Sequence, residues 1–375
     1  MMNSAYFMPT RIVTGPNCVF ENRGILKELG IRALVVTGKG SAKANGSYDD
    51  LAKALNANGQ SHVLYDKVMS NPTIDCVFEA AELARQEQCD FVAAIGGGSP
   101  MDTGKLAAGL AVQKIERPEL FSAVFAKALP IAAIPTTAGT GSEVTSTAVV
   151  TNSAAETKTS VVSPLFFPRF AFLDAGYMRN LNRETTINTA VDALSHAVEG
   201  MLSVRASPLT NALAKESIAV IMACLPALEA RLETPLEIRE KLLFASTLGG
   251  MVIANTGTTA VHPMGYKLTY FKNIDHGKAN GILLGHYLTV LEKKDQVLKT
   301  NRLNEVAAAL KVEGFDDFTR FLGRLFGKLE PITLSELETY AAAAIKAKNI
   351  GNCLIKPEQK DLLEIYTRAY RPSGA

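Results

Sequence analysis

The residue types best suited to chemistry gather in the second half of the chain. Asp192 and His196 are four residues apart within 186–202, whose apolar spacing predicts a helix, so both side chains leave the same face of it. His262 and His276 follow, each close to a glycine, which indicates helix or loop ends where side chains can converge. An aspartate with three histidines is a complete ligand set for Fe²⁺ or Zn²⁺, and it leaves one position for a water or substrate oxygen.

This metal hypothesis has a simpler alternative. A single Asp-x-x-x-His pair on a helix is more often a surface pair or an internal hydrogen bond than a metal site. Two observations favour the metal. Three of the five histidines of the chain lie within 196–276, and the first half of the chain carries the features of a cofactor site that such a metal would serve.

A glycine-rich turn in the first half of the chain could bind phosphate. Gly96-Gly-Gly-Ser-Pro-Met-Asp102 follows a short apolar segment, 91–95, typical of a buried strand, and is expected to open a helix over about 100–112 with Ser99 as its cap. Glycines let a ligand approach the backbone, and free amides at a helix start bind a pyrophosphate. The alternatives are a plain tight turn and, for the aspartate, helix capping. The predicted cofactor contacts here are Gly97, Gly98, Ser99 and Asp102.

A second polar stretch, 136–145, follows the next predicted strand, 131–135. It is rich in threonine and glycine, and the carboxyl ends of neighbouring strands in a parallel sheet form ligand crevices. The stretch could be an ordinary polar loop, but its position favours a second wall of the same cofactor site. We therefore predict cofactor contacts from Thr136, Thr137, Thr140 and the nearby Lys158.

The elements that must position these residues change character along the chain. Apolar runs over 33–37 and 91–95 alternate with an αβ unit over about 49–65 and a helix over 73–88, which predicts a doubly wound, mostly parallel α/β sheet. Beyond this part, apolar residues recur at helical spacing, which predicts an all-helical domain. The predicted domains are 1–182 for the dinucleotide and 183–375 for metal and substrate. Helices of the second domain are expected over 186–202, 207–230, 236–256, 281–293, 301–311, 315–327 and 334–347.

Composition excludes several classes of function. A net charge of +2 without a lysine or arginine run gives no case for a nucleic-acid partner. No apolar run is expected to span a bilayer, and the first residues lack the charged start and apolar core of a secretion signal. The five cysteines are scattered and fit reduced thiols. We therefore expect a cytoplasmic enzyme that acts on small molecules without a membrane.

Four motifs in order resemble the iron-containing (group III) alcohol dehydrogenase family. They are GGGSPMD at 96–102, IPTTAGTGSEV at 134–144, DALSHAVE at 192–199 and HGKAN at 276–280. The resemblance implies a nucleotide-binding α/β domain followed by a helical metal domain. It also implies NAD(P)-dependent interconversion of an alcohol and an aldehyde or ketone at Fe²⁺, with Zn²⁺ in some members. Family members are often dimers, so a homodimer is allowed here.

The family's functional residues transfer to this chain with one departure. The resemblance implies that Asp192, His196, His262 and His276 hold the metal, and that the last two are also catalytic. Many members carry a further histidine four residues after the third ligand, where this chain has Tyr266. A proton relay through that histidine is therefore absent. The tyrosine either substitutes as a phenolic donor or shapes the pocket.

The choice of nucleotide is predicted from the end of the first buried strand. Family members that use NAD tend to have an acidic residue there, which accepts the ribose 2′-hydroxyl and repels a 2′-phosphate. This chain has Gly38 in that place, with Lys39 and Ser41 nearby, so NADP(H) is expected to be preferred over NAD(H). The alternative is a solvated turn without preference. The predicted contacts here are Thr37, Gly38, Lys39 and Ser41.

Two other functions are weighed against the alcohol dehydrogenase. A dehydroquinate-synthase-like lyase would use the same nicotinamide and metal, but it needs a cluster of basic and amide side chains for a phosphorylated sugar acid. The stretch 246–280 offers only Lys267, Lys272 and Lys278 for that purpose. A zinc polyol dehydrogenase of the glycerol type is the second alternative.

Overall fold

A computed structural model of the chain describes residues 5–230 and 233–370. It divides into two compact units that are not continuous in sequence. The α/β unit comprises Phe7–Asn182 with Thr234–Leu243, and the helical unit comprises Met1–Tyr6, Arg183–Glu233 and Phe244–Ala375. Two short segments thus belong to the unit on the other side of position 182. The domain division at 182/183 stays a prediction.

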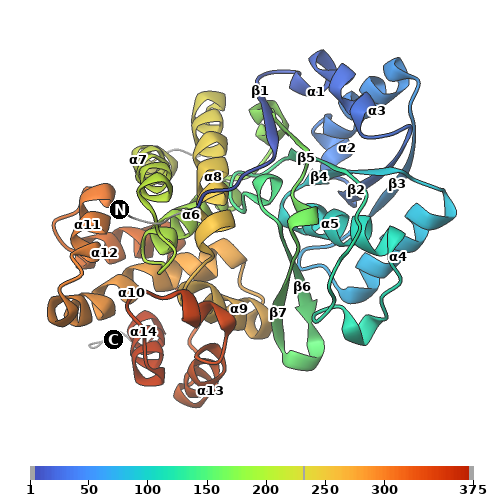
Figure 1. The fold of residues 1–375 in the computed structure, drawn as a ribbon. Helices are drawn as coiled ribbons and strands as arrows, with labels where there is room; N and C mark the ends of the chain where they lie inside the picture. The colour runs from blue at the N-terminus through green and yellow to red at the C-terminus, as the bar shows by residue number, and fades with distance from the viewer. Residues whose placement is uncertain (1–4, 231–232, 371–375) are drawn as a thin grey trace. The chain divides into compact units, whose positions relative to one another are not determined.

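The α/β unit is built on a six-stranded sheet in which every pairing of neighbours is parallel (Figure 1). The strand order is β1-β8-β5-β4-β2-β3. The central strands are continuous apolar runs because a parallel sheet is buried on both faces. The bounds are β1 (Arg11–Thr14), β2 (Arg32–Gly38), β3 (Ser61–Val68), β4 (Phe91–Gly96), β5 (Ile131–Pro135) and β8 (Phe170–Leu173).

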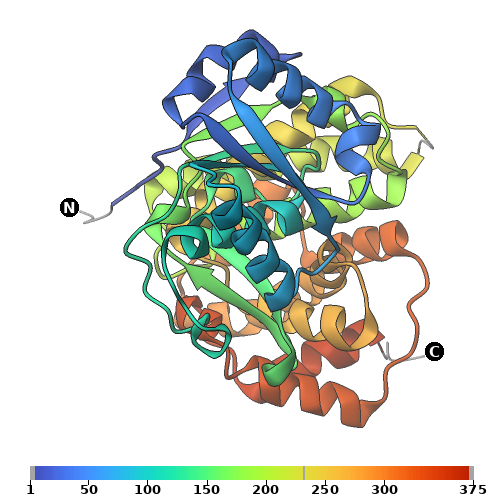
Figure 2. The ribbon, with the colours of Figure 1, turned by 90° about the vertical axis from the view of Figure 1, so that its right-hand side faces the viewer.

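Each face of this sheet has its own helices, as Figure 2 shows for the blue and teal parts of the chain. Successive strand residues point to opposite faces. Leu34 and Val36 of β2 pack into one core with α4 (Ile74–Gln86) and α5 (Gly98–Val112). The alternate residues of the same strand pack into a second core, whose helices are α1 (Cys18–Glu21), η1 (Arg23–Glu28) and α3 (Ser47–Asn58). The predicted doubly wound parallel sheet is confirmed.

Two local features of this unit differ from expectation. An antiparallel hairpin of β6 (Thr147–Asn152) and β7 (Thr157–Val162) follows β5, and it carries Lys158. Helix α5 begins at Gly98, so Ser99 lies inside the helix and does not cap it. The Ser99 hydroxyl instead accepts a hydrogen bond from the Asn71 amide at 3.3 Å. The remaining short elements are α2 (Ser41–Ala44), η2 (Arg117–Glu119), η3 (Ser142–Val144), η4 (Ser153–Ala155), η5 (Pro164–Phe166) and η6 (Ala175–Met178).

The described part of the second unit is helical, as predicted. Helix α8 contributes its turns up to Leu243 to the α/β unit and the rest to this one. Two further helices, α9 and α14, were not expected. In the sequence, Pro263 and Gly265 indicate a break in α9. The helix forms nevertheless, because a proline near a helix start does not break it. The bounds are α6 (Arg183–Met201), α7 (Pro208–Ala230), α8 (Leu236–Thr256), α9 (Val261–Lys272), α10 (His276–Leu298), α11 (Arg302–Leu310), α12 (Phe315–Phe326), α13 (Leu334–Ala344), η7 (Lys348–Asn352) and α14 (Gln359–Tyr370).

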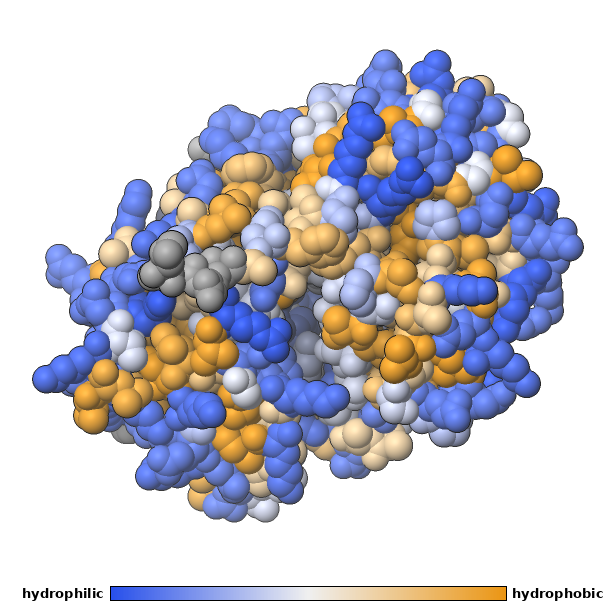
Figure 3. Space-filling view, in the orientation of Figure 1, coloured by the Kyte–Doolittle hydropathy of each residue, from blue (hydrophilic) through white to orange (hydrophobic). Residues whose placement is uncertain are grey.

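Helix α7 matches the predicted range 207–230 to within one residue, but it differs from the expectation that no apolar run could span a bilayer. By length and composition it could cross a membrane, which is weak evidence because core helices pass the same test. The helix packs against α6, and Lys215 on it pairs with Glu305 of α11. On the face of the molecule in Figure 3, hydrophilic residues are interspersed with separate groups of apolar ones.

Candidate metal centre and cofactor loops

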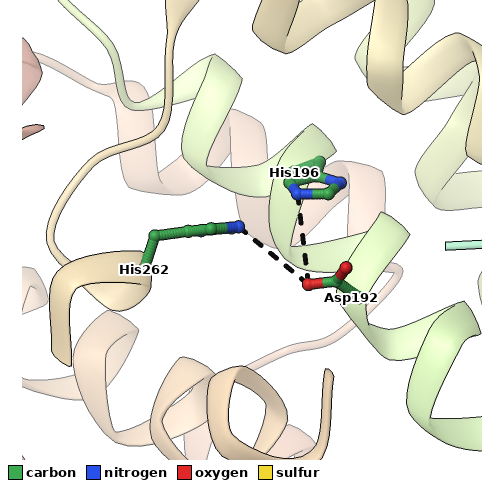
Figure 4. Close-up of side chains that lie close together, drawn as sticks. All are labelled: Asp192, His196 and His262. Atoms are coloured by element: carbon green, nitrogen blue, oxygen red, sulfur yellow. Dashed lines mark ion pairs between the residues drawn. The ribbon is translucent and has the colours of Figure 1, made fainter. Parts of the chain in front are cut away.

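Three predicted ligands converge on one carboxylate oxygen. Helix α6 presents Asp192 and His196 one turn apart, and the second residue of α9 adds His262 (Figure 4). The Oδ1 atom of Asp192 lies 4.0 Å from Nε2 of His196 and 3.9 Å from Nε2 of His262. One ligand atom from each residue lies within 4.8 Å of the other two, and all three residues are buried. This arrangement fits a divalent metal ion.

The fourth predicted ligand joins the same cluster. His276 is the first residue of α10, and its Nε2 atom lies 3.8 Å from Oδ1 of Asp192. Its side chain is 21% exposed, whereas the other imidazoles are 3–5% exposed, so the accessible side of the cluster lies at this residue. Burial alone would raise the pKa of Asp192, but the three imidazoles and the amide of Asn280 lower it to about 2. The carboxylate is therefore ionised at neutral pH.

A buried glutamate sets the proton position on one imidazole. Glu199 lies two turns after Asp192 on α6 and is fully buried. Its Oε1 atom accepts hydrogen bonds from the amide and hydroxyl of Thr259 at 2.8 and 2.9 Å and from the Val261 amide at 3.1 Å. Its Oε2 atom accepts one from Nδ1 of His262. In the neutral tautomer that donates from Nδ1, the Nε2 atom of that histidine carries a lone pair on the side of Asp192, so both atoms can act as metal ligands.

An asparagine also contacts the cluster. The amide nitrogen of Asn280, on α10, donates to Oδ1 of Asp192 at 2.9 Å. The same nitrogen lies 3.4 Å from Nε2 of His262 and 3.2 Å from Nε2 of His276. A Cβ atom at Gly265 would lie 2.0 Å from the Asn280 side chain, so only glycine permits this approach of α9 to α10.

Sequence reasoning assigned no role to Glu199 or Asn280. A usable signal existed for the glutamate, because Asp192, His196 and Glu199 are spaced by four and three residues and so share one helix face. The ring of Tyr266 stacks on His276, with 5.1 Å between ring centroids and 23° between planes. This placement supports the interpretation that the tyrosine shapes the pocket beside the metal ligands.

The two predicted cofactor loops lie against each other. They follow the neighbouring strands β4 and β5, and the Thr136 amide donates to the Gly96 carbonyl at 2.9 Å. A Cβ atom at Gly97 would lie 3.1 Å from the Thr137 hydroxyl, and one at Gly98 would lie 2.9 Å from the Thr140 methyl group. The structure therefore brings Gly97, Gly98, Ser99, Thr136, Thr137 and Thr140 to one place at the carboxyl edge of the sheet.

Asp102 is placed differently from the rest of its loop. One carboxylate oxygen accepts a hydrogen bond from the Ser142 hydroxyl at 2.7 Å, and the other accepts one from the Val149 amide at 3.0 Å. Both oxygens are thus engaged within the protein, and the residue lies beyond the first turn of α5. Its contact with a cofactor stays a prediction. Lys158 lies on β7, opposite Thr151 of β6.

The predicted nucleotide-selecting residues lie where β2 meets α2. Thr37 is buried, whereas Lys39 and Ser41 are exposed. A Cβ atom at Gly38 would meet the Val68 carbonyl at 3.4 Å and the Ser41 hydroxyl at 3.7 Å, so a side chain fits there. The segment itself has no carboxylate, but Asp66 on β3 pairs with Lys43 at 2.8 Å.

Comparisons with known proteins match most of the chain to one family. Residues 9–175 match the family "Iron-containing alcohol dehydrogenase", and residues 186–370 match "Fe-containing alcohol dehydrogenase family, C-terminal". The 1,3-propanediol dehydrogenase of Citrobacter freundii is 34% identical, over 91% of this chain and 85% of that protein. The NAD-dependent methanol dehydrogenase of Bacillus methanolicus is 31% identical, over 81% of this chain and 79% of its own.

The solved structures agree with the sequences. An iron-containing alcohol dehydrogenase from Thermotoga maritima superposes with a TM-score of 0.89 at 38% identity, covering 98% of this chain and 99% of that one. Both halves of the chain match one family, whose name refers to iron. The helical unit contains a cluster of aspartate and histidine side chains that could hold such a metal ion. The chain therefore belongs to the iron-containing alcohol dehydrogenase family, NAD(P)-dependent oxidoreductases.

Proposed function

We propose that this protein interconverts small aldehydes or ketones and their alcohols, with NADP(H) as the preferred nucleotide and Fe²⁺ held by Asp192, His196, His262 and His276. The observation that carries the proposal is the convergence of three imidazole Nε2 atoms on the Asp192 carboxylate. When bound, the metal polarises a substrate oxygen while the nicotinamide donates or accepts the hydride. Because the chain belongs to a family of oxidoreductases, we prefer this function to the dehydroquinate-synthase-like lyase.

The side chains around the cluster prepare it for that chemistry. Glu199 fixes the tautomer of His262 so that a lone pair points toward Asp192. Asn280 holds the Asp192 carboxylate in place through a 2.9 Å hydrogen bond. Tyr266 covers one face of His276, the most accessible of the ligands, and so limits the space for the substrate. This arrangement favours small substrates.

The preference for NADP(H) is supported by the chain after β2. No carboxylate stands at Gly38 to repel a 2′-phosphate, and the exposed Lys39 and Ser41 supply donors. The relative from Bacillus methanolicus is NAD-dependent by name, so membership of the family does not decide the nucleotide. Steady-state kinetics with both nucleotides tests the preference, and an equal or higher kcat/KM with NADH would contradict it.

The reaction is tested with metal-free protein reloaded with Fe²⁺ or Zn²⁺ under anaerobic conditions. We expect oxidation of NADPH with acetaldehyde, butanal or lactaldehyde, and higher turnover with Fe²⁺. Higher turnover with Zn²⁺ and glycerol or dihydroxyacetone would favour the polyol dehydrogenase instead. No turnover of any carbonyl or alcohol with either metal and either nucleotide would overturn the proposal.

A His262→Ala variant separates the metal's role from that of the nucleotide. Loss of one imidazole is expected to lower metal affinity and turnover together, because a three-ligand site binds more weakly and loses its geometry. NADPH affinity should persist, since the proposed nucleotide residues belong to the other unit. Metal content, NADPH affinity and aldehyde reduction are measured on the same sample. Full turnover by metal-free protein would show that the metal is not needed for the chemistry.

We also propose that the enzyme is cytoplasmic and forms a homodimer. All five cysteines lie in the described part of the chain and none of them forms a disulfide there, which fits a reducing compartment. Dimerisation rests on the family resemblance alone. Light scattering from the purified protein measures its mass, and a monomer at micromolar concentration would contradict the dimer.

A further inference from the structure

A lysine is buried completely behind the cofactor loops. Lys105 lies on α5, has no exposed surface, and is not among the residues that the proposed reaction uses. Its ammonium group donates hydrogen bonds to the Ser142 hydroxyl at 2.6 Å, the Thr145 hydroxyl at 3.1 Å and the Thr147 carbonyl at 2.9 Å. All three available protons of the group are used, and every acceptor lies within one short segment, 142–147.

A carboxylate completes the same network. Asp102 lies one turn earlier on α5, and its nearer oxygen is 3.9 Å from the Lys105 nitrogen. It accepts from the Ser142 hydroxyl at 2.7 Å and from the Val149 amide at 3.0 Å. Burial lowers the pKa of Lys105 to about 8, although the charges of Asp102 and Glu143 oppose the change. Helix α5 is thus joined to segment 142–149 by charged hydrogen bonds that are largely buried.

We call the hydrogen bonds of Lys105 and Asp102 with segment 142–149 the anchor. The helix that carries it, α5, also forms part of the predicted phosphate site at its start. Gly97 and Gly98 lie at the start of α5, and Lys105 lies two turns later. The helix packs closely on the sheet at Gly104, where an added Cβ atom would lie only 2.9 Å from the Ala94 side chain. Segment 142–147 directly continues the threonine loop, and the Ser142 amide donates to the Thr140 hydroxyl at 3.3 Å. The anchor therefore fixes the second loop to the helix that forms the first.

We propose that Lys105 is a positioning residue for the nucleotide: by binding Ser142, Thr145 and Thr147 it holds the Thr136–Thr140 loop against Gly97 and Gly98. This inference rests on the proposed nucleotide site. Lys105 itself does not touch the cofactor. Lys105 affects nucleotide binding through the spacing between the glycine turn and the Thr136–Thr140 loop. These two loops pack so closely at Gly97 and Gly98 that neither can move without the other.

A purely stabilising role makes a different prediction. In that case, a variant that still folds would bind the nucleotide as the natural protein does. In the positioning role, nucleotide affinity falls even in the folded variant, because the loops no longer hold their spacing. The first measurement is therefore the dissociation constant for NADPH and NADH, from titration calorimetry well below the unfolding temperature.

The main variant is Lys105→Met, which keeps an unbranched side chain of nearly the same length and removes the three donors. We expect its dissociation constant for NADPH to rise about tenfold or more, the size of the loss when one hydrogen bond to a charged phosphate is broken. Its affinity for Zn²⁺ should be unchanged, because the metal ligands belong to the other unit. A Lys294→Met variant is the matched control, since this lysine also pairs with a carboxylate, Asp361 of α14, but belongs to the helical unit.

A milder variant, Thr145→Val, removes one of the three acceptors and keeps the volume of the side chain. If Lys105→Met does not fold, this variant distinguishes the positioning role from a purely stabilising one. A loss of NADPH affinity in Thr145→Val, smaller than that expected for Lys105→Met, supports the proposal. Wild-type nucleotide affinity in every variant that folds would overturn it. Failure of the natural protein to bind either nucleotide would instead overturn the proposed function.

Discussion

At the scale of single residues, Glu199 decides which nitrogen of His262 faces the metal cluster. In a Glu199→Gln variant the amide oxygen can keep the bonds to Thr259 and Val261. The amide NH₂ group then faces Nδ1 of His262 in place of the present carboxylate oxygen. Two donors would oppose each other, so the imidazole proton moves to Nε2 and blocks the ligand position. We expect metal affinity to fall about 10–100-fold.

Competition with a chelator measures this change in metal affinity. Glu237→Gln is a suitable control because it removes an exposed carboxylate paired with Lys241. NADPH affinity should stay at the natural value in both variants. Unchanged metal affinity in Glu199→Gln would show that the glutamate does not act through His262.

Residue types and spacing along the chain predicted four metal ligands, and the structure brings these four side chains together at Oδ1 of Asp192. His262 and His276 could be found because histidine is rare in this chain and each is close to a glycine in the sequence. The role of Asn280 could not be found in this way. Its amide meets Asp192 across 88 positions of the sequence, and only the packing of α10 on α6 brings them together.

At the scale of elements, continuous apolar runs predicted the parallel strands, and helical spacing predicted most of the helices. The errors have local causes. Helix α9 contains Pro263 and Gly265, which indicate a break when tertiary contacts are unknown. The β6–β7 hairpin has strands with many half-exposed residues, so it lacks the apolar run of a buried strand. Ser99 failed as a cap because α5 starts at Gly98, two residues earlier than the sequence suggests.

The end of β2 carries the next prediction. A Gly38→Asp variant places a carboxylate where the 2′-phosphate of NADPH is proposed to lie, and the position has room for it. Like charges at close range disfavour NADPH, whereas a carboxylate accepts the 2′-hydroxyl of NADH. We expect the ratio of kcat/KM for NADPH to that for NADH to fall about tenfold or more.

Steady-state aldehyde reduction with both nucleotides measures the ratio. The control, Gly24→Asp, adds the same charge at another glycine of this unit that has free space around it. An unchanged ratio in Gly38→Asp would remove this position from the nucleotide site.

At the scale of the whole molecule, the chain assigns different tasks to its two units. In the α/β unit, parallel strands bring glycine and threonine loops to one edge of the sheet. In the helical unit, α6, α9 and α10 bring their side chains to one buried point. The order of these elements follows from the sequence. The shared contact at Oδ1 of Asp192 does not, because it depends on how three helices pack.

Stability against acid depends on a histidine outside the metal cluster. His286 lines a cavity of about 80 Å³ between α10, α12 and α14, with Leu322 and Phe326 among its neighbours. Burial, and then the charge of Arg368, lower the pKa of His286 from 6.5 to about 4. Between these two pH values the unfolded chain binds a proton that the folded chain does not, so acid favours unfolding.

We therefore expect His286→Leu to reduce the loss of stability on acidification. The neutral imidazole should account for up to about 3 kcal/mol of the unfolding free energy that is lost between pH 6.5 and 4, and leucine has no proton to bind. Urea unfolding followed by circular dichroism at several pH values between these limits gives both slopes, with metal-free protein used throughout to remove the effect of ligand protonation. Asp192 has a pKa near 2, so its contribution falls mostly below this range. Equal slopes for the variant and the natural protein would mean that His286 is already protonated when folded.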